Sequence, residues 1–320
     1  AVYASDTSFV TLTNSGTEVA RLQLTHSNPV MKNNENRFLT YGIGSSSYEI
    51  SSFDETLYSG NAENKIYTGD VASNGTYCLV TEDNGYLTTL YAYSKNNNRI
   101  YKYSFSEYYI TSVAINKDGS GCVATGVSSD KGSAVTGVYV LDFSQEKPVS
   151  TYKISGDSVL DCKYLTSDTA VLVGSQASYI VKKGEKNYKT VSYEDKTLSN
   201  YCFNTDTSTY TMALSRSGDG RSVALISYNS NGEAQYTINT EHKADSLSVY
   251  KGTVAILDGN VVYGYNQNGD LLYSTNSGTG SKKIVLASDY TAYILSVNQI
   301  RFIDLDSVSS DDTAQTSKQE

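Results

Sequence analysis

The chain has 320 residues, with 25 Lys and Arg against 34 Asp and Glu, so its formal net charge at pH 7 is −9. An acidic chain repels the phosphate backbone, and we therefore expect no nucleic-acid partner. No apolar run approaches the roughly 18 residues of a membrane-spanning helix. Two Pro and 24 Gly exclude a collagen-like or Pro/Gly-rich disordered chain.

Short alternating runs rich in Val, Ile, Thr and Tyr, separated by Asn/Gly turns, predict β-strands along the whole chain. Residues 1–24 contain one hairpin, Phe9–Gly16, and supply a partial blade. A clear hairpin follows at Thr111–Thr125, and Ala224–Tyr236 and Val261–Tyr273 repeat the order strand, Asn/Gly turn, strand. Gly and Asn suit these turns because both tolerate a positive φ.

Two successive hairpins make a four-stranded antiparallel meander. This meander recurs about every 40 to 45 residues, a period that is typical of β-propeller blades. Full blades are predicted at 25–60, 61–105, 106–155, 156–195, 196–241 and 242–276. Three further strands are expected at Lys282–Ala287, Thr291–Ser296 and Gln299–Leu305.

We expect these last strands to join the partial blade of residues 1–24 in one composite blade, because a ring closed by strands from both termini leaves no free edge. The prediction is an all-β fold, a single β-propeller domain over residues 1–305 with seven blades favoured and eight as the alternative. Residues 306–320 are polar and acidic without apolar periodicity, which indicates a flexible tail.

The four cysteines, Cys78, Cys122, Cys162 and Cys202, follow one another at intervals of 44, 40 and 40 residues. This spacing matches the repeat and fits neither a disulfide framework nor a CxxC metal site. We expect all four to be reduced and buried as small apolar side chains. Cys78 and Cys122 should occupy equivalent positions in neighbouring blades about 10 Å apart, which is too far for a disulfide.

Motifs for cofactor or metal chemistry are missing from the sequence. The chain has two histidines, His26 and His242, both in polar stretches between predicted blades, and we expect them to be exposed loop residues rather than catalytic ones. The scattered Cys and His form no zinc ligand cluster, and neither GxGxxG nor GxxxxGK[ST] is present to bind a phosphate. The absence of Trp also argues against a quinone cofactor. The sequence therefore predicts no metal, no cofactor and no recognisable catalytic residue.

Carboxylates are the remaining route to an enzyme. A glycosidase-like pair needs two Asp or Glu about 5 to 10 Å apart on one cleft. Asp70, Asp161 and Asp245 lie on or beside predicted innermost strands and are the candidates. The alternative is that they are hydrogen-bonding partners near the central channel.

The 29 tyrosines are the compositional excess of the chain. Many alternate along predicted strands, where the ring packs and the hydroxyl stays wet, but Tyr is also enriched at binding surfaces. The densest cluster beside a loop is Glu107, Tyr108 and Tyr109, which are our candidate binding residues. Because binding residues are drawn disproportionately from loops on a rigid frame, a partner is expected first at the loops Ser106–Tyr109, Asn239–Asp245 and Asn276–Ser281.

Several segments carry a resemblance to a known group of proteins: Asn28–Val30, Tyr48–Ile50, Gly75–Glu82, Leu90–Tyr93, and Tyr109–Ile115 with Asp118-Gly119. Together they resemble a domain-of-unknown-function family from Gram-positive bacteria. Members of that family are similar to WD40-like and quinoprotein-like propellers and often follow an N-terminal membrane anchor. The resemblance implies a propeller that is extracellular or on the cell surface, attached to the membrane through an anchor ahead of this segment, and it supplies no catalytic residues.

These observations predict a monomeric, non-enzymatic cell-surface module that binds or scaffolds a protein or a glycan. The alternatives are a carboxylate-dependent glycan hydrolase or lyase and an envelope assembly factor. The acidic balance favours a neutral or basic partner, because charge complementarity guides encounter.

Overall fold

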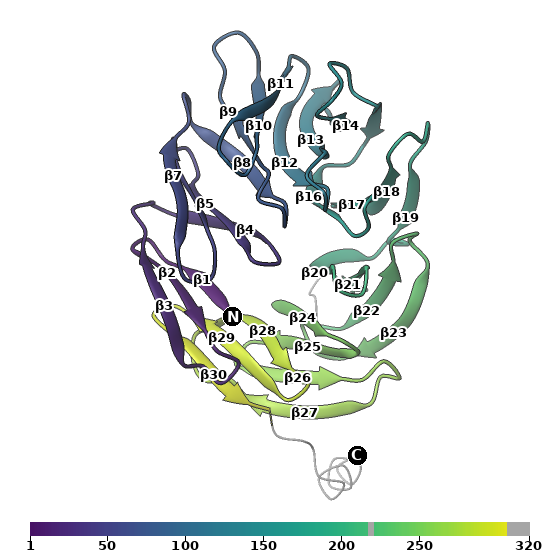
Figure 1. Ribbon diagram of the computed structural model, residues 1–320. Helices are drawn as coiled ribbons and strands as arrows, with labels where there is room; N and C mark the ends of the chain where they lie inside the picture. Colours follow the sequence, from purple (N-terminus) through teal and green to yellow (C-terminus); the bar gives the residue numbers. More distant parts are fainter. Residues whose placement is uncertain (217–220, 306–320) are drawn as a thin grey trace, which may run out of the picture. The chain divides into compact units, whose positions relative to one another are not determined.

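The computed structural model describes residues 1–216 and 221–305, and in these residues the chain runs through strands, turns and loops with no helix (Figure 1). None of the described residues therefore forms a helix long and apolar enough to cross a membrane. The described chain divides into two compact units. The larger comprises Val2–Thr13 and Thr17–Ser192, and the smaller comprises the residues from Tyr193 onward with Ala1 and Asn14–Gly16.

The larger unit contains five antiparallel sheets, in each of which consecutive strands are hydrogen-bonded neighbours. The first sheet has three strands, β1 (Val2–Ala4), β2 (Ser8–Leu12) and β3 (Glu18–Gln23). The second has β4 (Pro29–Asn34), β5 (Arg37–Gly42), β6 (Ser47–Ser51) and β7 (Thr56–Asn61). The third has β8 (Ile66–Val71), β9 (Tyr77–Thr81), β10 (Thr88–Tyr93) and β11 (Arg99–Phe105).

The fourth and fifth sheets complete this unit and have four strands each. The fourth has β12 (Tyr109–Ile115), β13 (Gly121–Asp130), β14 (Ser133–Asp142) and β15 (Ser150–Ser155). The fifth has β16 (Val159–Tyr164), β17 (Thr169–Gly174), β18 (Ala177–Lys182) and β19 (Lys189–Ser192).

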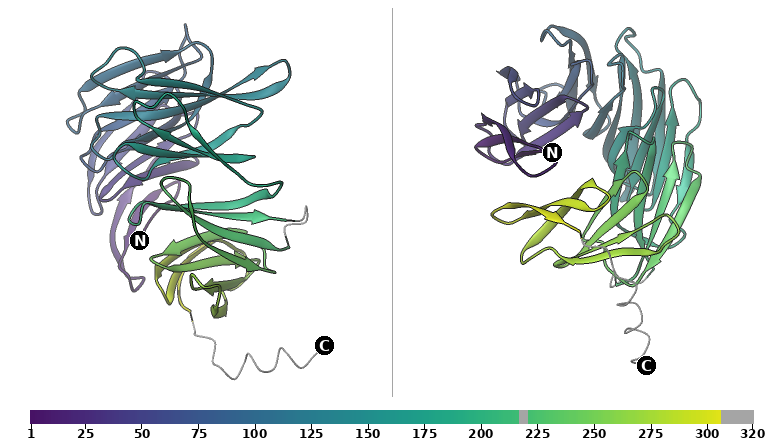
Figure 2. Two further views of the ribbon diagram at one scale, coloured as in Figure 1. Left: turned by 90° about the vertical axis from the view of Figure 1, so that its right-hand side faces the viewer. Right: turned by 60° about the horizontal axis from the view of Figure 1, so that its bottom comes forward.

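The smaller unit contains three antiparallel sheets of the same meander type (Figure 2). The first has β20 (Thr197–Asn204), β21 (Thr209–Ser215), β22 (Val223–Asn229) and β23 (Ala234–Thr240). The second has β24 (Ser246–Tyr250), β25 (Thr253–Asp258), β26 (Val261–Tyr265) and β27 (Leu271–Asn276). The third has three strands, β28 (Ser281–Ser288), β29 (Thr291–Ser296) and β30 (Ile300–Asp304).

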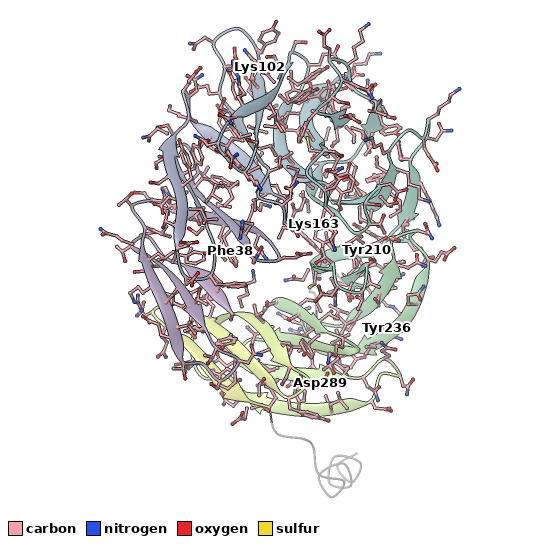
Figure 3. The ribbon with its side chains drawn as sticks, in the orientation of Figure 1. Phe38, Lys102, Lys163, Tyr210, Tyr236 and Asp289 are labelled. Atoms are coloured by element: carbon pink, nitrogen blue, oxygen red, sulfur yellow. The ribbon has the colours of Figure 1, made fainter. Side chains whose placement is uncertain are left out.

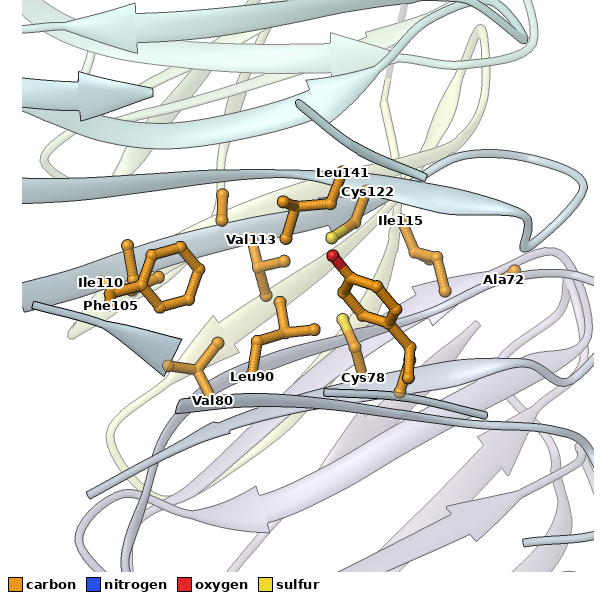
Figure 4. Close-up of a cluster of buried hydrophobic side chains, with 13 residues drawn as sticks. Ala72, Cys78, Val80, Leu90, Phe105, Ile110, Val113, Ile115, Cys122 and Leu141 are labelled. Carbon is orange, nitrogen blue, oxygen red and sulfur yellow. The ribbon is translucent and has the colours of Figure 1, made fainter. Parts of the chain in front are cut away.

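The core lies between the faces of neighbouring sheets. Middle strands such as β9 are buried along their whole length because another sheet covers each face, whereas last strands such as β7 alternate between exposed and half-buried residues. Figure 4 shows the contact between the third and fourth sheets, where Val80 and Leu90 meet Val113 and Leu141. One continuous apolar layer therefore joins these two sheets.

The structure confirms the six predicted full blades and corrects the blade count. Eight sheets are present in the described residues, not seven. The N-terminal segment forms three strands by itself, because β1 pairs with β2 through Val2↔Thr11 and occupies the sheet edge that a C-terminal strand was expected to take. Strands β28 to β30 likewise pair among themselves. The prediction of seven blades with a composite closing blade is wrong, and the predicted tail at 306–320 lies outside the described residues.

All four cysteines are free thiols, as expected. Cys78, Cys122 and Cys162 are buried, but Cys202 is only half-buried, so the expectation of four buried thiols is wrong at this position. The thiols of Cys78, in the third sheet, and Cys122, in the fourth sheet, face each other and form a hydrogen bond (Figure 4). Burial, and to a smaller extent this hydrogen bond, raise the pKa of the Cys122 thiol.

Candidate functional site

A groove of about 460 Å³ lies between the third and fourth sheets of the larger unit. We call it the tyrosine groove and define it by its lining residues: Tyr103, Ser104 and Phe105 of β11, Ser106, Glu107 and Tyr108 of the following loop, Tyr139 of β14, and Thr151, Tyr152 and Lys153 of β15. Two of the three predicted binding residues, Glu107 and Tyr108, line this groove. The third, Tyr109, is 53% exposed and is not among the lining residues.

Two glycines hold Tyr108 in place. Gly126 of β13 and Gly137 of β14 are direct cross-strand partners. A Cβ atom on Gly137 would come within 2.5 Å of the Tyr108 ring, and one on Gly126 would come within 2.9 Å of the Tyr108 Cβ. Glycine within a strand often marks such a close approach. The Tyr108 ring therefore rests on a patch of bare backbone.

The aromatic wall of the groove is built around Tyr139. Its ring centroid lies 4.9 Å from that of Phe105, 6.0 Å from that of Tyr103 and 6.1 Å from that of Tyr108. Two of these contacts, with Phe105 and Tyr108, are edge-to-face, an arrangement that the ring quadrupoles favour. The rings come from both sheets, so packing of the two sheets sets the shape of the wall.

The charges in the groove are unequal. The Lys153 ammonium donates a hydrogen bond to Asp130 Oδ2 at 2.9 Å, whereas Glu107 is exposed and has no hydrogen-bond or ion-pair partner among the described residues. Burial and then the nearby Glu107 charge raise the pKa of the Tyr103 phenol, and the same causes raise that of Tyr139 to about 12. Both phenols are therefore neutral at physiological pH.

Glu107 differs from the polar residues in several other loops that join successive sheets. In three such loops a polar side chain bonds the turn between the second and third strands of the next sheet. His26 lies 2.9 Å from Ser47 Oγ through its Nδ1 atom, Asp157 accepts from Ser175 N at 2.9 Å, and Asp245 accepts from Gly259 N at 3.0 Å.

Glu107 stands at the same place, between β11 and β12, but the corresponding turn is out of its reach. Strands β13 and β14 are 10 residues long, whereas the middle strands β17 and β18 have 6 residues. The turn at Lys131 and Gly132 is therefore carried beyond the loop, and the Glu107 carboxylate stays available to solvent.

Asp157 and His26 are residues that sequence reasoning missed or misread. His26 is 2% exposed rather than an exposed loop residue, because its loop folds onto the start of β6. Burial lowers the pKa of His26. His242, in the smaller unit, is half-buried, and its ring stacks on Tyr263 with centroids 3.5 Å apart. The signal for His26 and Asp157 was a polar residue shortly before the first strand of a blade.

Asp70 and Asp161 lie on first strands, as predicted, and both face lysines of the larger unit. Asp70 Oδ2 accepts a hydrogen bond from Ile115 N at 3.0 Å, and Oδ1 lies 3.7 Å from Lys163 Nζ. Of these residues, Lys163 is labelled in Figure 3. Asp161 Oδ1 lies 3.6 Å from Lys32 Nζ. Asp245 belongs to the smaller unit. The bond to Ile115 connects the third sheet to the fourth, and the two lysine contacts connect the fifth sheet to the third and to the second. These contacts favour the interpretation as hydrogen-bonding partners over that of a glycosidase pair.

The other two predicted binding loops lie in the smaller unit. In Asn239–Asp245 the carboxylate bonds the turn described above. In Asn276–Ser281 the Ser277 hydroxyl donates to Asn260 O at 2.8 Å and lies 2.9 Å from Ser281 Oγ, so the hydroxyl of this loop is used within the fold. Of the three loops, only Ser106–Tyr109 contributes residues to the tyrosine groove.

Several solved structures are similar to this chain in fold. The C-terminal WD40 domain of Sif2 matches with a TM-score of 0.60, covering 87% of this chain and 80% of its own at 15% identity. A eukaryotic initiation factor matches with 0.64, covering 95% and 82% at 11% identity. Chaetomium thermophilum Sqt1, solved bound to the N-terminus of the ribosomal protein L10, matches with 0.59, covering 94% and 91% at 10% identity.

Identities this low show the fold alone, and that fold is a WD40-like β-propeller with eight blades. The chain matches the family described as Family of unknown function (DUF5711) over residues 2–305, and it belongs to that family. No curated protein sequence matches it. The resemblance to a family of unknown function with WD40-like propellers is thereby confirmed.

Proposed function

We propose that this chain is a non-enzymatic binding module that takes a segment of a protein partner into the tyrosine groove. The groove itself is the observation that carries the proposal. It offers four tyrosines and several hydroxyls in one concave site, and such clusters of aromatic residues dominate the energy of protein interfaces.

The groove is also held rigid before any partner arrives. Its walls belong to two sheets that share a continuous buried core, and Tyr108 is seated on two glycines. A preformed site loses little conformational entropy on binding. The similar propeller Sqt1 was solved bound to the N-terminus of a ribosomal protein, which supports a peptide segment as the occupant.

The cell-surface location expected from the sequence is part of the same proposal. It is supported by the low content of charged residues, 18%, and by the resemblance to a family whose members often follow a membrane anchor. Labelling of intact cells with an antibody against the domain tests it. Signal that appears only after the cells are lysed would contradict this location.

Photo-crosslinking tests the groove as the binding site. A crosslinking amino acid at Ser106, in the groove, should capture one partner from native cell envelope, and the same group at the exposed Tyr86 should not. The captured segment should then bind Tyr108→Ala at least tenfold more weakly than wild type, with Tyr86→Ala unchanged. Ser106→Arg, which alters an exposed loop position, should also block binding without a folding defect.

Equal binding of the partner to wild type, Tyr108→Ala and Ser106→Arg would overturn the groove as the site. Capture that is lost after glycosidase treatment of the envelope but survives protease treatment would replace the protein partner by a glycan.

A further inference from the structure

We infer that the tyrosine groove is specific for a cationic side chain, and that the partner segment places an arginine against Glu107. This inference rests on the proposed function, whose site it uses. It adds the chemistry by which the occupant is recognised.

The charged residues of the tyrosine groove favour a cationic occupant. Lys153 and Glu107 are its charged residues. The Lys153 ammonium is already neutralised by Asp130 at 2.9 Å, while Glu107 has no ion-pair or hydrogen-bond partner in the described part of the chain. The groove therefore presents one carboxylate that has no direct hydrogen-bond or ion-pair partner among the described residues, and a basic group is its complement.

The Glu107 carboxylate is left without a partner by the way its loop meets the next sheet. At three other loops between sheets, the polar side chains of His26, Asp157 and Asp245 bond the turn of the next sheet. At Glu107 the long β13–β14 hairpin removes that turn. The fold therefore does not use this carboxylate, although it uses a polar residue at three of the other loops between sheets.

The aromatic wall of the tyrosine groove favours an arginine as the cationic side chain. The faces of Tyr103, Tyr108 and Tyr139 carry the negative side of the aromatic quadrupole, and a guanidinium is weakly hydrated and stacks on such faces. The same pairing occurs within the third sheet, where Arg99 Cζ lies 5.8 Å from the ring centroid of Tyr91. The raised pKa values of the Tyr103 and Tyr139 phenols keep those two rings neutral, so Glu107 is the anion that an arginine would meet.

The volume and the polar lining of the groove fit a peptide segment around the arginine. A volume of about 460 Å³ exceeds that of a single side chain, so an arginine and the backbone on either side of it can enter together. The hydroxyls of Ser104, Ser106 and Thr151 line the same groove and can bond the peptide groups of that segment. Contacts of this kind favour a peptide over an isolated small cation.

The test is an NMR titration of the whole 320-residue chain with three capped peptides, Gly-Ser-X-Ser-Gly, in which X is arginine, lysine or citrulline. Citrulline keeps the shape and most hydrogen bonds of arginine but has no charge. The arginine peptide should shift the amide signals of Gly126 and Gly137 and bind at least fivefold more tightly than the citrulline peptide, because loss of a partly desolvated ion pair and of its cation–π contact costs about that much.

Two variants and one control complete the test. Glu107→Gln should remove the preference for arginine over citrulline. Asp130→Asn should weaken binding of the arginine peptide, because it releases Lys153 to compensate Glu107. Glu146→Gln, which changes the net charge by the same amount at an exposed position outside the groove, should leave the preference intact.

The inference is overturned if citrulline and arginine peptides bind wild type within twofold of each other, if Glu107→Gln behaves like Glu146→Gln, or if no peptide shifts Gly126 and Gly137. Tighter binding of the lysine peptide than of the arginine peptide would overturn the choice of arginine. A native partner that requires Tyr108 but not Glu107 would refute the cationic residue and leave the proposed function standing. A native partner that binds equally well without Tyr108 and without Glu107 would refute the proposed function.

Discussion

Replacement of Asp157 by Ala should unfold the larger unit at much lower denaturant concentration. Asp157 lies in the loop between β15 and β16 and is 3% exposed. Its carboxylate accepts hydrogen bonds from Ser175 N and Oγ, Gln176 N, Ala177 N and the Tyr179 hydroxyl, at 2.6 to 3.2 Å. One buried anion therefore holds the whole turn between β17 and β18.

The magnitude follows from these contacts. A hydrogen bond to a charged group contributes about 1.5–3 kcal/mol, and a buried donor left without a partner costs about 1–3 kcal/mol. The contributions do not add in full, because the turn can relax toward water when the carboxylate is removed. We expect Asp157→Ala to lower the free energy of unfolding by about 4 kcal/mol, in the range for breaking a buried charged contact.

Asp157→Asn should cost about 2–3 kcal/mol, because the amide keeps one acceptor but turns an NH₂ group toward the remaining donors. Urea unfolding followed by circular dichroism measures both values. Thermal unfolding should show a fall of about 8–16 °C for the Ala variant, at about 2–4 °C per kcal/mol for a unit of this size.

The matched control is Asp245→Asn. Asp245 occupies the same kind of loop, but it is exposed and its carboxylate accepts a hydrogen bond from Gly259 N at 3.0 Å. Asp245→Asn should lower the free energy of unfolding by less than about 1 kcal/mol. A loss below about 1 kcal/mol for Asp157→Ala, or equal losses for Asp157→Ala and Asp245→Asn, would refute the view that this carboxylate holds the turn.

Three further outcomes are expected. Thiol titration of the denatured chain should count four free sulfhydryls, and in the native protein Cys162 should react slowly because burial raises the pKa of its thiol to about 12; a count of two or fewer would contradict this. Gly137→Ala should displace the Tyr108 ring and weaken binding of the arginine peptide severalfold. Gly85→Ala, whose Cβ would only make an ordinary contact of 3.7 Å with Asp83 Oδ1, should not, and NMR titration distinguishes the two variants. Hydrogen bonds from Lys183 and Ser144 lower the pKa of Asp142 to about 2, below its ordinary value of 3.8. The stability that Asp142 contributes is therefore present above its ordinary pKa and is lost as the pH falls toward 2, and acid titration of Asp142→Asn should lack this component.

The tyrosine groove shows how far the sequence could reach toward the site. Glu107 and Tyr108 were identified because aromatic residues cluster beside a predicted inter-blade loop. Tyr139 and Lys153 were not identified, because they lie on later strands that alternate like any others, and only the pairing of β13, β14 and β15 within the fourth sheet brings them to Tyr108. The unpaired state of Glu107 depends on how the neighbouring β13–β14 hairpin lies beside its loop, which is a tertiary property.

The sequence by itself determined the strands, the turns and the six complete blades. These features are local: Gly119 and Gly269 adopt φ of +71° and +90° where turns were predicted, and alternation marks the strands between them. Strand pairing at the two ends is not local. A strand as short as Val2–Ala4 has no periodicity to detect, and its place is decided by which edge of β2 is open.

Burial of polar loop residues was likewise decided by tertiary structure alone. His26 and Asp157 have polar neighbours and look exposed in the sequence, yet both are buried because their loops fold onto a turn of the next sheet. A buried polar group is stable only where partners are in place. Those partners lie about 20 residues further along the chain, as the separations of 21 residues for His26 and Ser47 and 18 residues for Asp157 and Ser175 show, so no local pattern could reveal them.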